Sequence, residues 1–155
     1  MFESNPMLKI NRQTDYAVRI VLALARRGEG VRLSSHEIQR EMQIPPSLMP
    51  RIVALLAHTG LVNTFPGRDG GLMLPRPAAQ ITLRDVVEVV EGPILLSDCL
   101  QVEKEEDCPF ELNCPVRSKW GRVQVAMLRE MAAITFESLV QEELRTPIKV
   151  PSQIT

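Results

Sequence analysis

The sequence predicts a mostly α-helical fold with a small β-hairpin (α+β): a winged helix-turn-helix domain followed by a long C-terminal dimerisation helix. Three observations predict it. Apolar residues recur at helical spacing through residues 12–27. Two prolines, Pro45 and Pro46, make a tight turn between two short helical patterns. The dipeptide Asp69-Gly70 lies between two strand-like runs, as in a hairpin.

The ends of the first two helices are marked by local signals. Gly28 and Gly30 end the first helix after residue 27. Ser34 and Glu37 form a capping box at the start of the second helix, which is expected to extend to about Met42. The helix-turn-helix order therefore begins with two well-bounded helices.

The third helix and the hairpin follow directly. Ser47 is expected to cap the third helix, with Pro50 in its first turn, where a missing N–H costs least. Residues 61–65 and 72–74 are predicted as strands joined by a tip at residues 66–71. Together these elements predict a recognition helix followed by a wing.

The C-terminal half is predicted to contain a helix from Thr82 to Gly92 and one long helix over residues 115–144. The long helix is apolar on two stripes about 200° apart. A second chain covering one of them gives a homodimer; the alternative is a helix inside a compact monomer. The expected dimer stripe is Trp120, Val123, Met127, Met131 and Ile134, and the opposite one is Val125, Leu128, Ala132, Phe136 and Leu139.

The chain of 155 residues is long enough for one domain with an extension. The expected organisation is a flexible N-terminal extension at 1–8, the winged helix-turn-helix at 9–80, a linking helix and cysteine loop at 81–114, the dimerisation helix at 115–145, and a disordered tail at 146–155.

Charge is divided unevenly between the two halves. Residues 9–84 hold 11 Lys/Arg against 5 Asp/Glu, whereas residues 85–155 hold 7 against 13. A basic first half suits a polyanion such as double-stranded DNA. No apolar run approaches the ~20 residues of a membrane span, and no secretory signal is evident, so a cytoplasmic location is expected. Two histidines and no phosphate loop give no basis for an enzyme.

The candidate DNA contacts are on the third helix and the wing. Ser47, Met49 and Arg51 are expected to be exposed at the start of the third helix, and Arg51 would bind a guanine or a phosphate. Arg68 at the wing tip would reach the minor groove or the backbone. The alternative is that these arginines are ordinary solvated surface. The expected phosphate contacts are Arg12, Arg32, Arg40 and Arg76.

Three cysteines, Cys99, Cys108 and Cys114, are spaced C-x8-C-x5-C, and the sequence has no others. Three thiolates at one point would supply most of a soft-metal site. Nearby carboxylates disfavour thiolates in an empty site, and a bound cation reverses this, so metal binding should order the loop. Thiolates bind both iron–sulfur clusters and zinc, so the site could hold either. A metal-free thiol switch is a further alternative. The acidic residues are Asp98, Glu103, Glu105, Glu106, Asp107 and Glu111.

Six short motifs follow one another along residues 7–144. They are Thr14-Asp15-Tyr16-Ala17, Ile44-Pro45-Pro46, Gly60-Leu61-Val62, Gly67-x-x-Gly70-Gly71, Asp85-Val86-Val87-x-x-Val90-Glu91-Gly92 and Cys108-Pro109-x4-Cys114-Pro115. In this ordered set the chain resembles the IscR/NsrR-type regulators, also called the Rrf-two family. The resemblance implies a dimeric bacterial repressor or activator that binds an inverted-repeat operator, with an iron–sulfur cluster that senses iron–sulfur status, redox state or nitric oxide and controls DNA affinity.

The resemblance also implies how a cluster would be held. Three cysteines leave one position open, and in some members a first-helix carboxylate of the partner subunit fills it, which Asp15 matches. Other members use a histidine three residues after the last cysteine, where this chain has Arg117. A 2Fe–2S cluster is expected in preference to 4Fe–4S. Asp15 could instead simply be an acid at a helix start.

Overall fold

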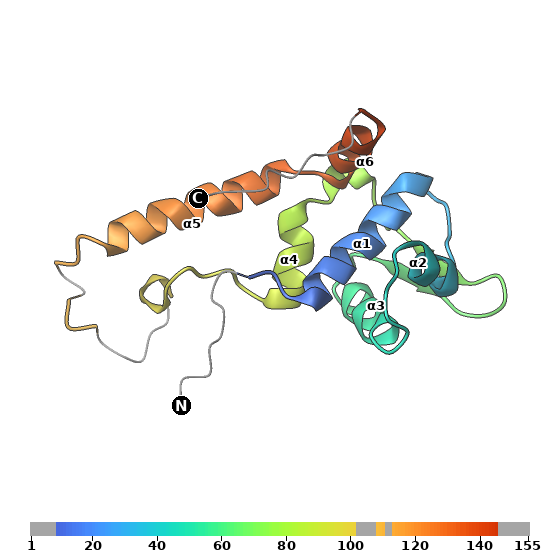
Figure 1. The fold of residues 1–155 in the computed structure, drawn as a ribbon, viewed down its shortest axis with the longest axis horizontal. Coiled ribbons are helices and arrows are strands. Elements are labelled where there is room, and N and C mark those ends of the chain that lie inside the picture. Colours follow the sequence, from blue (N-terminus) through green and yellow to red (C-terminus); the bar gives the residue numbers. More distant parts are fainter. Residues whose placement is uncertain (1–8, 102–107, 111–112, 146–155) are drawn as a thin grey trace.

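A computed structural model describes residues 9–101, 108–110 and 113–145. The predicted N-terminal extension (1–8), the predicted tail (146–155) and most of the acidic residues around the cysteines lie outside the described residues. The described part contains six α-helices and one antiparallel pair of strands, which confirms the predicted fold class (Figure 1). The elements are α1 (Arg12–Arg27), α2 (Ser35–Glu41), α3 (Met49–His58), β1 (Asn63–Phe65), β2 (Gly71–Met73), α4 (Leu83–Glu91), α5 (Arg117–Ala133) and α6 (Phe136–Arg145).

The first two helices begin and end as predicted. Helix α1 is capped by Asn11, whose side chain accepts a hydrogen bond from the Thr14 N–H, and ends at Gly28 with a φ of 89°. The predicted capping box of α2 is confirmed: the Glu37 N–H donates to Ser34 Oγ at 3.1 Å, and the Ser34 N–H donates to Glu37 Oε2 at 2.9 Å. The backbone bond from Ser34 lowers the pKa of the Glu37 carboxyl below its ordinary value.

The start of α3 differs from the prediction in two ways. Its N-cap is Leu48, and no side chain caps it, so the expected cap at Ser47 is wrong. The backbone supplies the turn instead, since the N–H groups of Leu48 and Met49 both donate to Pro45 O, at 3.0 and 3.3 Å. Met49 was expected to be exposed, but it is 3% exposed and belongs to the hydrophobic core, because the first turn of α3 already packs inward.

The wing is a short hairpin attached to the preceding loop. Strands β1 and β2 pair with Asn63 opposite Met73 and Phe65 opposite Gly71. Leu33, before α2, adds an isolated bridge to Leu72, with bonds of 2.9 and 2.7 Å. The strands are shorter than predicted because Leu61 and Val62 pack in the core, where both N–H groups donate to Leu56 O.

Helix α1 lies at the centre of the fold. It contacts α2, α3, α4 and α6, so the recognition helix and the C-terminal helix rest on the same support (Figure 1). Burial of large aliphatic side chains supplies the main stabilisation, about 1.5–3 kcal/mol for each. The largest fully buried apolar side chains are Phe136, Ile20, Leu24, Ile38, Ile52, Leu56, Leu72 and Ile81.

The predicted continuous helix over residues 115–144 is wrong, because it is broken between α5 and α6. At the break, the chain forms a β-bridge with the strand-like residues before α4: the Leu83 N–H donates to Ile134 O at 2.8 Å and the Phe136 N–H to Ile81 O at 2.9 Å. The Thr135 hydroxyl accepts a hydrogen bond from the Ser138 N–H. Helix α6 therefore turns back onto α1, and Phe136 becomes fully buried.

Helix α5 extends from the body of the molecule like an arm (Figure 1). Every residue of α5 keeps part of its surface exposed, and the half-buried ones, such as Gln124, Leu128 and Met131, lie at helical spacing on one side. That side contacts α4 and the short turn at Asp98–Leu100. Within the described segments, no helix has the length and hydropathy needed to cross a membrane.

Candidate DNA-binding surface and cysteine segment

The predicted recognition helix and wing border a common hollow. Ser34 and Ser35 at the start of α2, Val53 of α3 and Arg68 at the wing tip all line it. Ser47, Arg51 and Arg68 are exposed, as expected of groups that contact DNA, whereas Met49 is buried and can only support the helix from behind. The fold therefore places the start of α2, the recognition helix and the wing around one surface.

Arg32 has a structural contact that the sequence did not predict. Its guanidinium lies over the ring of Phe65 in β1, 3.7 Å from the ring centroid. Such a cation–π contact holds the loop before α2 against the wing and leaves part of the guanidinium free for a phosphate. At the wing, Gly70 cannot carry a side chain, because a Cβ there would lie 2.1 Å from Phe65 O.

The other predicted phosphate contacts differ in their surroundings. Arg12 and Arg40 are exposed, and Arg40 lies beside Arg27, Glu37 and Glu41 in a second hollow. Arg76 is within 3.8 Å of Asp85, so part of its charge is already balanced in the free protein.

Arg26 joins three helices through ion pairs that sequence reasoning missed. Its Nε donates to Glu143 of α6 at 2.8 Å, and its Nη1 donates to Glu41 of α2 at 3.1 Å. Hydrogen bonding to Glu143 raises the pKa of Arg26, and the same bond lowers the pKa of the Glu143 carboxyl below its ordinary value. Stability from this pair is therefore present above the ordinary glutamate pKa and is lost as the pH falls through the lowered value.

Cys99, Cys108 and Cys114 are half-buried free thiols that precede α5. Cys99 lies in the short turn at Asp98–Leu100, and its Sγ is 3.2 Å from Ser97 Oγ. Among the described residues, no three His, Cys, Asp or Glu side chains lie close enough together to hold a metal ion.

Residues 92–99, which lead from α4 to the first cysteine and are here called the cysteine segment, are attached to α5. The Leu96 N–H donates to Gln124 Oε1 at 3.0 Å, and a Cβ at Gly121 would be in ordinary contact with Leu100. The first cysteine is therefore carried by a segment that is fixed between α4 and the arm helix.

Asp15, the predicted fourth ligand, is already paired. Its Oδ2 lies 2.8 Å from Arg19 Nη2, one turn along α1. Arg19 also donates to Met42 O at 3.4 Å, in the turn before α3, and lies over the ring of Tyr16. Asp15 thus belongs to a chain of polar contacts that ends at the turn leading to the recognition helix.

A second polar network joins α1 to α4, and sequence reasoning missed it. Glu91, the last residue of α4, accepts hydrogen bonds from the Thr14 hydroxyl and, at 3.2 Å, from the Asn11 N–H. In the sequence, Glu91 was noticeable only as part of the Val90-Glu91-Gly92 family motif. Nothing in the neighbouring residues explains why an acid is needed there.

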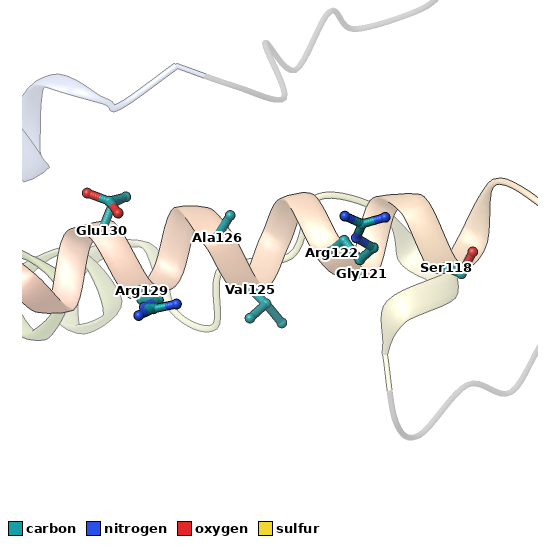
Figure 2. A pocket seen from close by; sticks show the side chains of 7 residues that line it. All are labelled: Ser118, Gly121, Arg122, Val125, Ala126, Arg129 and Glu130. Carbon is teal, nitrogen blue, oxygen red and sulfur yellow. The ribbon is translucent and has the colours of Figure 1, made fainter.

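One side of α5 combines charged and small apolar side chains. Figure 2 shows Ser118, Arg122, Val125, Ala126, Arg129 and Glu130 along this shallow hollow, with Val125 and Arg129 pointing to the same side. Trp120 and Val123 lie on a different side of α5 and are 46% and 51% exposed. Exposed apolar side chains therefore occur on both sides of α5, and the charged ones Arg122, Arg129 and Glu130 lie on the side of Val125.

A winged helix-turn-helix with basic groups on its recognition helix and wing defines a DNA-binding protein. The family model described as "Rrf2: Iron-dependent Transcriptional regulator" matches residues 10–142. The chain belongs to the Rrf2 family of transcriptional regulators, which confirms the resemblance found in the sequence motifs.

Individual relatives agree with this assignment. The chain is 35% identical to Protein aau3 of Rhizobium meliloti over 86% of each chain. It is 24% identical to the HTH-type transcriptional regulator NsrR of Oceanobacillus iheyensis, over 88% of this chain and 92% of that protein. The structure of CymR, the global cysteine regulator of Bacillus subtilis, matches with a TM-score of 0.71 and 27% identity, over 87% of this chain and 98% of that one.

Proposed function

We propose that this protein is a dimeric regulator whose affinity for an inverted-repeat operator is set by an iron–sulfur cluster bound to Cys99, Cys108 and Cys114. The observation that carries the proposal is the position of these cysteines, the only ones in the chain, between α4 and the arm helix α5. The family description as iron-dependent regulators supports iron as the metal. Redox state or nitric oxide are the signals that such a cluster would report.

The donor set fits such a cluster. Three free thiols supply the soft ligands that iron–sulfur clusters require. A fourth ligand from Asp15 of a partner subunit would have to give up the Asp15–Arg19 ion pair, which releases Arg19 beside the turn before α3. With one oxygen ligand, a 2Fe–2S cluster is the type that we favour.

A metal-free thiol switch is the second candidate. The similarity to CymR, described as a global cysteine regulator, favours it. The half-buried thiols of this chain could also form a reversible disulfide if the loop brings two of them together. Zinc held by the same cysteines and Asp15 would make the site structural.

Changing Cys108 to alanine distinguishes these candidates. Protein purified without oxygen is expected to be coloured, with iron and sulfide in near-equal amounts, and Cys108→Ala is expected to lose both because two thiolates cannot hold the cluster. The measurement is a visible absorption spectrum with iron, sulfide and zinc analysis. Glu142→Ala, at an exposed position on α6 outside the cysteine segment, is the control and should keep the colour. Colourless wild-type protein that holds zinc, or that stays metal-free after reconstitution, would contradict the cluster.

We infer that Arg51 contributes base recognition and that the arginines around it position the duplex. In the dimer, two recognition helices would lie about one duplex turn apart, roughly 34 Å. Arg51→Ala is expected to weaken binding to a specific duplex by about 1–3 kcal/mol, with a smaller effect on a scrambled duplex.

The specific duplex would be selected from a random pool by the wild-type protein, and affinity measured by fluorescence anisotropy at fixed salt. Arg129→Ala, an exposed arginine on α5, serves as the control and should leave the affinity unchanged. Equal losses on both duplexes would assign Arg51 to the phosphate backbone instead.

The dimer is proposed to form through Trp120, Val123, Met127, Met131 and Ile134, the predicted stripe of the arm helix. Met127, Met131 and Ile134 are already half-buried within the single chain. Trp120 and Val123 are exposed, so they would supply most of the surface that a second copy of α5 would cover. The charged face with Arg122, Arg129 and Glu130 is less suited to that role, because burying charges without partners is costly.

A further inference from the structure

Thr14 is the polar side chain that this fold buries most completely. Among the described residues it is the single polar residue that is buried, with no exposed surface. Its hydroxyl donates to Glu91 Oε1, across 77 positions of sequence, and lies 3.3 Å from Asn11 Oδ1. A threonine hydroxyl has one proton, so it can donate fully to only one of these two acceptors at a time.

The Glu91 end of this network is directly joined to the cysteine segment. Glu91 is the last residue of α4, and Gly92, with a φ of 79°, turns the chain away from the helix. The following residues lead to Cys99 and are fixed to α5 through Leu96 and Gln124. Only the four residues 92–95 separate Glu91 from Leu96, so a shift of Leu96 along with α5 would be transmitted to Glu91 over a short length of chain.

The Thr14 end is joined to the DNA-binding domain. Asn11 caps α1 by accepting from the Thr14 N–H at 2.9 Å, and its own N–H donates to Glu91. Helix α1 contacts α3, and at its other end Arg26 is paired with Glu41 of α2. The first turn of α1 therefore lies between the cysteine segment and the recognition helix.

We propose that the hydrogen-bond network of Asn11, Thr14 and Glu91, here called the α1–α4 latch, transmits the state of the cysteine segment to the DNA-binding domain. Thr14 and Glu91 act as positioning residues. The proposal rests on the proposed function, in which the cysteine segment changes state. When the segment shifts, Glu91 withdraws, the Thr14 hydroxyl turns to Asn11 Oδ1, and the first turn of α1 is released from α4.

The test is amide hydrogen exchange at residues 11–15 in the full chain, with Cys108 intact and with Cys108→Ala. The expected result is a roughly tenfold difference in the exchange rate of these amides between the two chains, the size of effect that follows from gaining or losing a bond to a charged group. Thr14→Val should give fast exchange in both backgrounds, and Thr14→Ser, which keeps the hydroxyl, should restore the dependence on Cys108.

A second variant covers the case in which Thr14→Val does not fold. Glu91 is exposed, so Glu91→Ala removes the acceptor without opening a cavity, and it is expected to match Thr14→Val. Exchange at residues 11–15 that is insensitive to Cys108 in the wild-type chain would overturn the latch. The latch would also be overturned if replacing Cys108 changed exchange at residues 11–15 by the same factor in the Glu91→Ala chain as in the wild-type chain.

Affinity for the selected duplex, measured in parallel, separates this proposal from the proposed function. If Cys108→Ala changes exchange at residues 11–15 but leaves affinity unchanged, the latch stands and the proposed regulation fails. If Cys108→Ala changes affinity by the same factor in the wild-type and Glu91→Ala chains, the regulation stands and the latch is overturned. A change in affinity that is lost in Glu91→Ala and kept in Thr14→Ser supports both.

Discussion

Replacing Phe136 by alanine is expected to lower the free energy of unfolding by about 3–5 kcal/mol, the usual cost of removing a buried aromatic side chain. Phe136 is fully buried and begins α6, and its N–H donates to Ile81 O. The side chain therefore anchors α6 to the core. A domain of this size has only about 5–15 kcal/mol of stability, so the variant should be close to unfolding near body temperature.

Urea denaturation followed by far-UV circular dichroism measures this loss. Leu144→Ala is the matched control, since Leu144 lies on the same helix and is 84% exposed; its effect should stay within about 0.5 kcal/mol. A loss below about 1 kcal/mol for Phe136→Ala would mean that α6 is not held in the core in solution.

Replacing Val123 by glutamate is expected to separate the proposed dimer. Val123 is 51% exposed in the single chain, so the change should leave the monomer folded. In the dimer it would bury an unpaired carboxylate, which costs about 3–5 kcal/mol. The dimer constant should weaken by roughly two to four orders of magnitude, and affinity for a two-half-site duplex should fall with it.

Val125→Glu is the matched control, because Val125 is the same residue type on the same helix, 65% exposed, and about 200° from Val123 around the helix axis. Light scattering after size-exclusion chromatography gives the mass of each variant. The single tryptophan, Trp120, adds a fluorescence signal that should shift to longer wavelength on exposure. A dimer that survives Val123→Glu and dissociates in Val125→Glu would move the interface to the side of α5 shown in Figure 2.

These two predictions test different parts of one arrangement. Helix α6 rests on α1 through Phe136 and the Arg26–Glu143 pair, and α5 leads away from it toward the cysteines. A dimer formed through α5 would therefore set the distance between two DNA-binding domains. Because α6 is fixed to its own DNA-binding domain, the distance set at α5 would also fix the distance between the two recognition helices.

Local signals in the sequence determined the helices and turns of the DNA-binding domain. The capping box of Ser34 and Glu37, the glycine after Arg27 and the hairpin tip at Asp69-Gly70 each act through neighbouring residues, so one short window is enough to recognise them. The family motifs, taken in order along the chain, were enough to identify the class of regulator. The cysteine set was evident from composition and spacing.

Tertiary structure alone decided the features that depend on distant partners. The break before Phe136 follows from pairing with Ile81 and Leu83, some 50 residues earlier, and periodicity cannot show it because the apolar spacing continues through the break. Met49 is buried because α3 packs on the core, and Thr14 is matched with Glu91 only because α1 lies against α4. Helical spacing determines which residues share one face of a helix. Only the packing of the whole chain determines which other elements that face contacts.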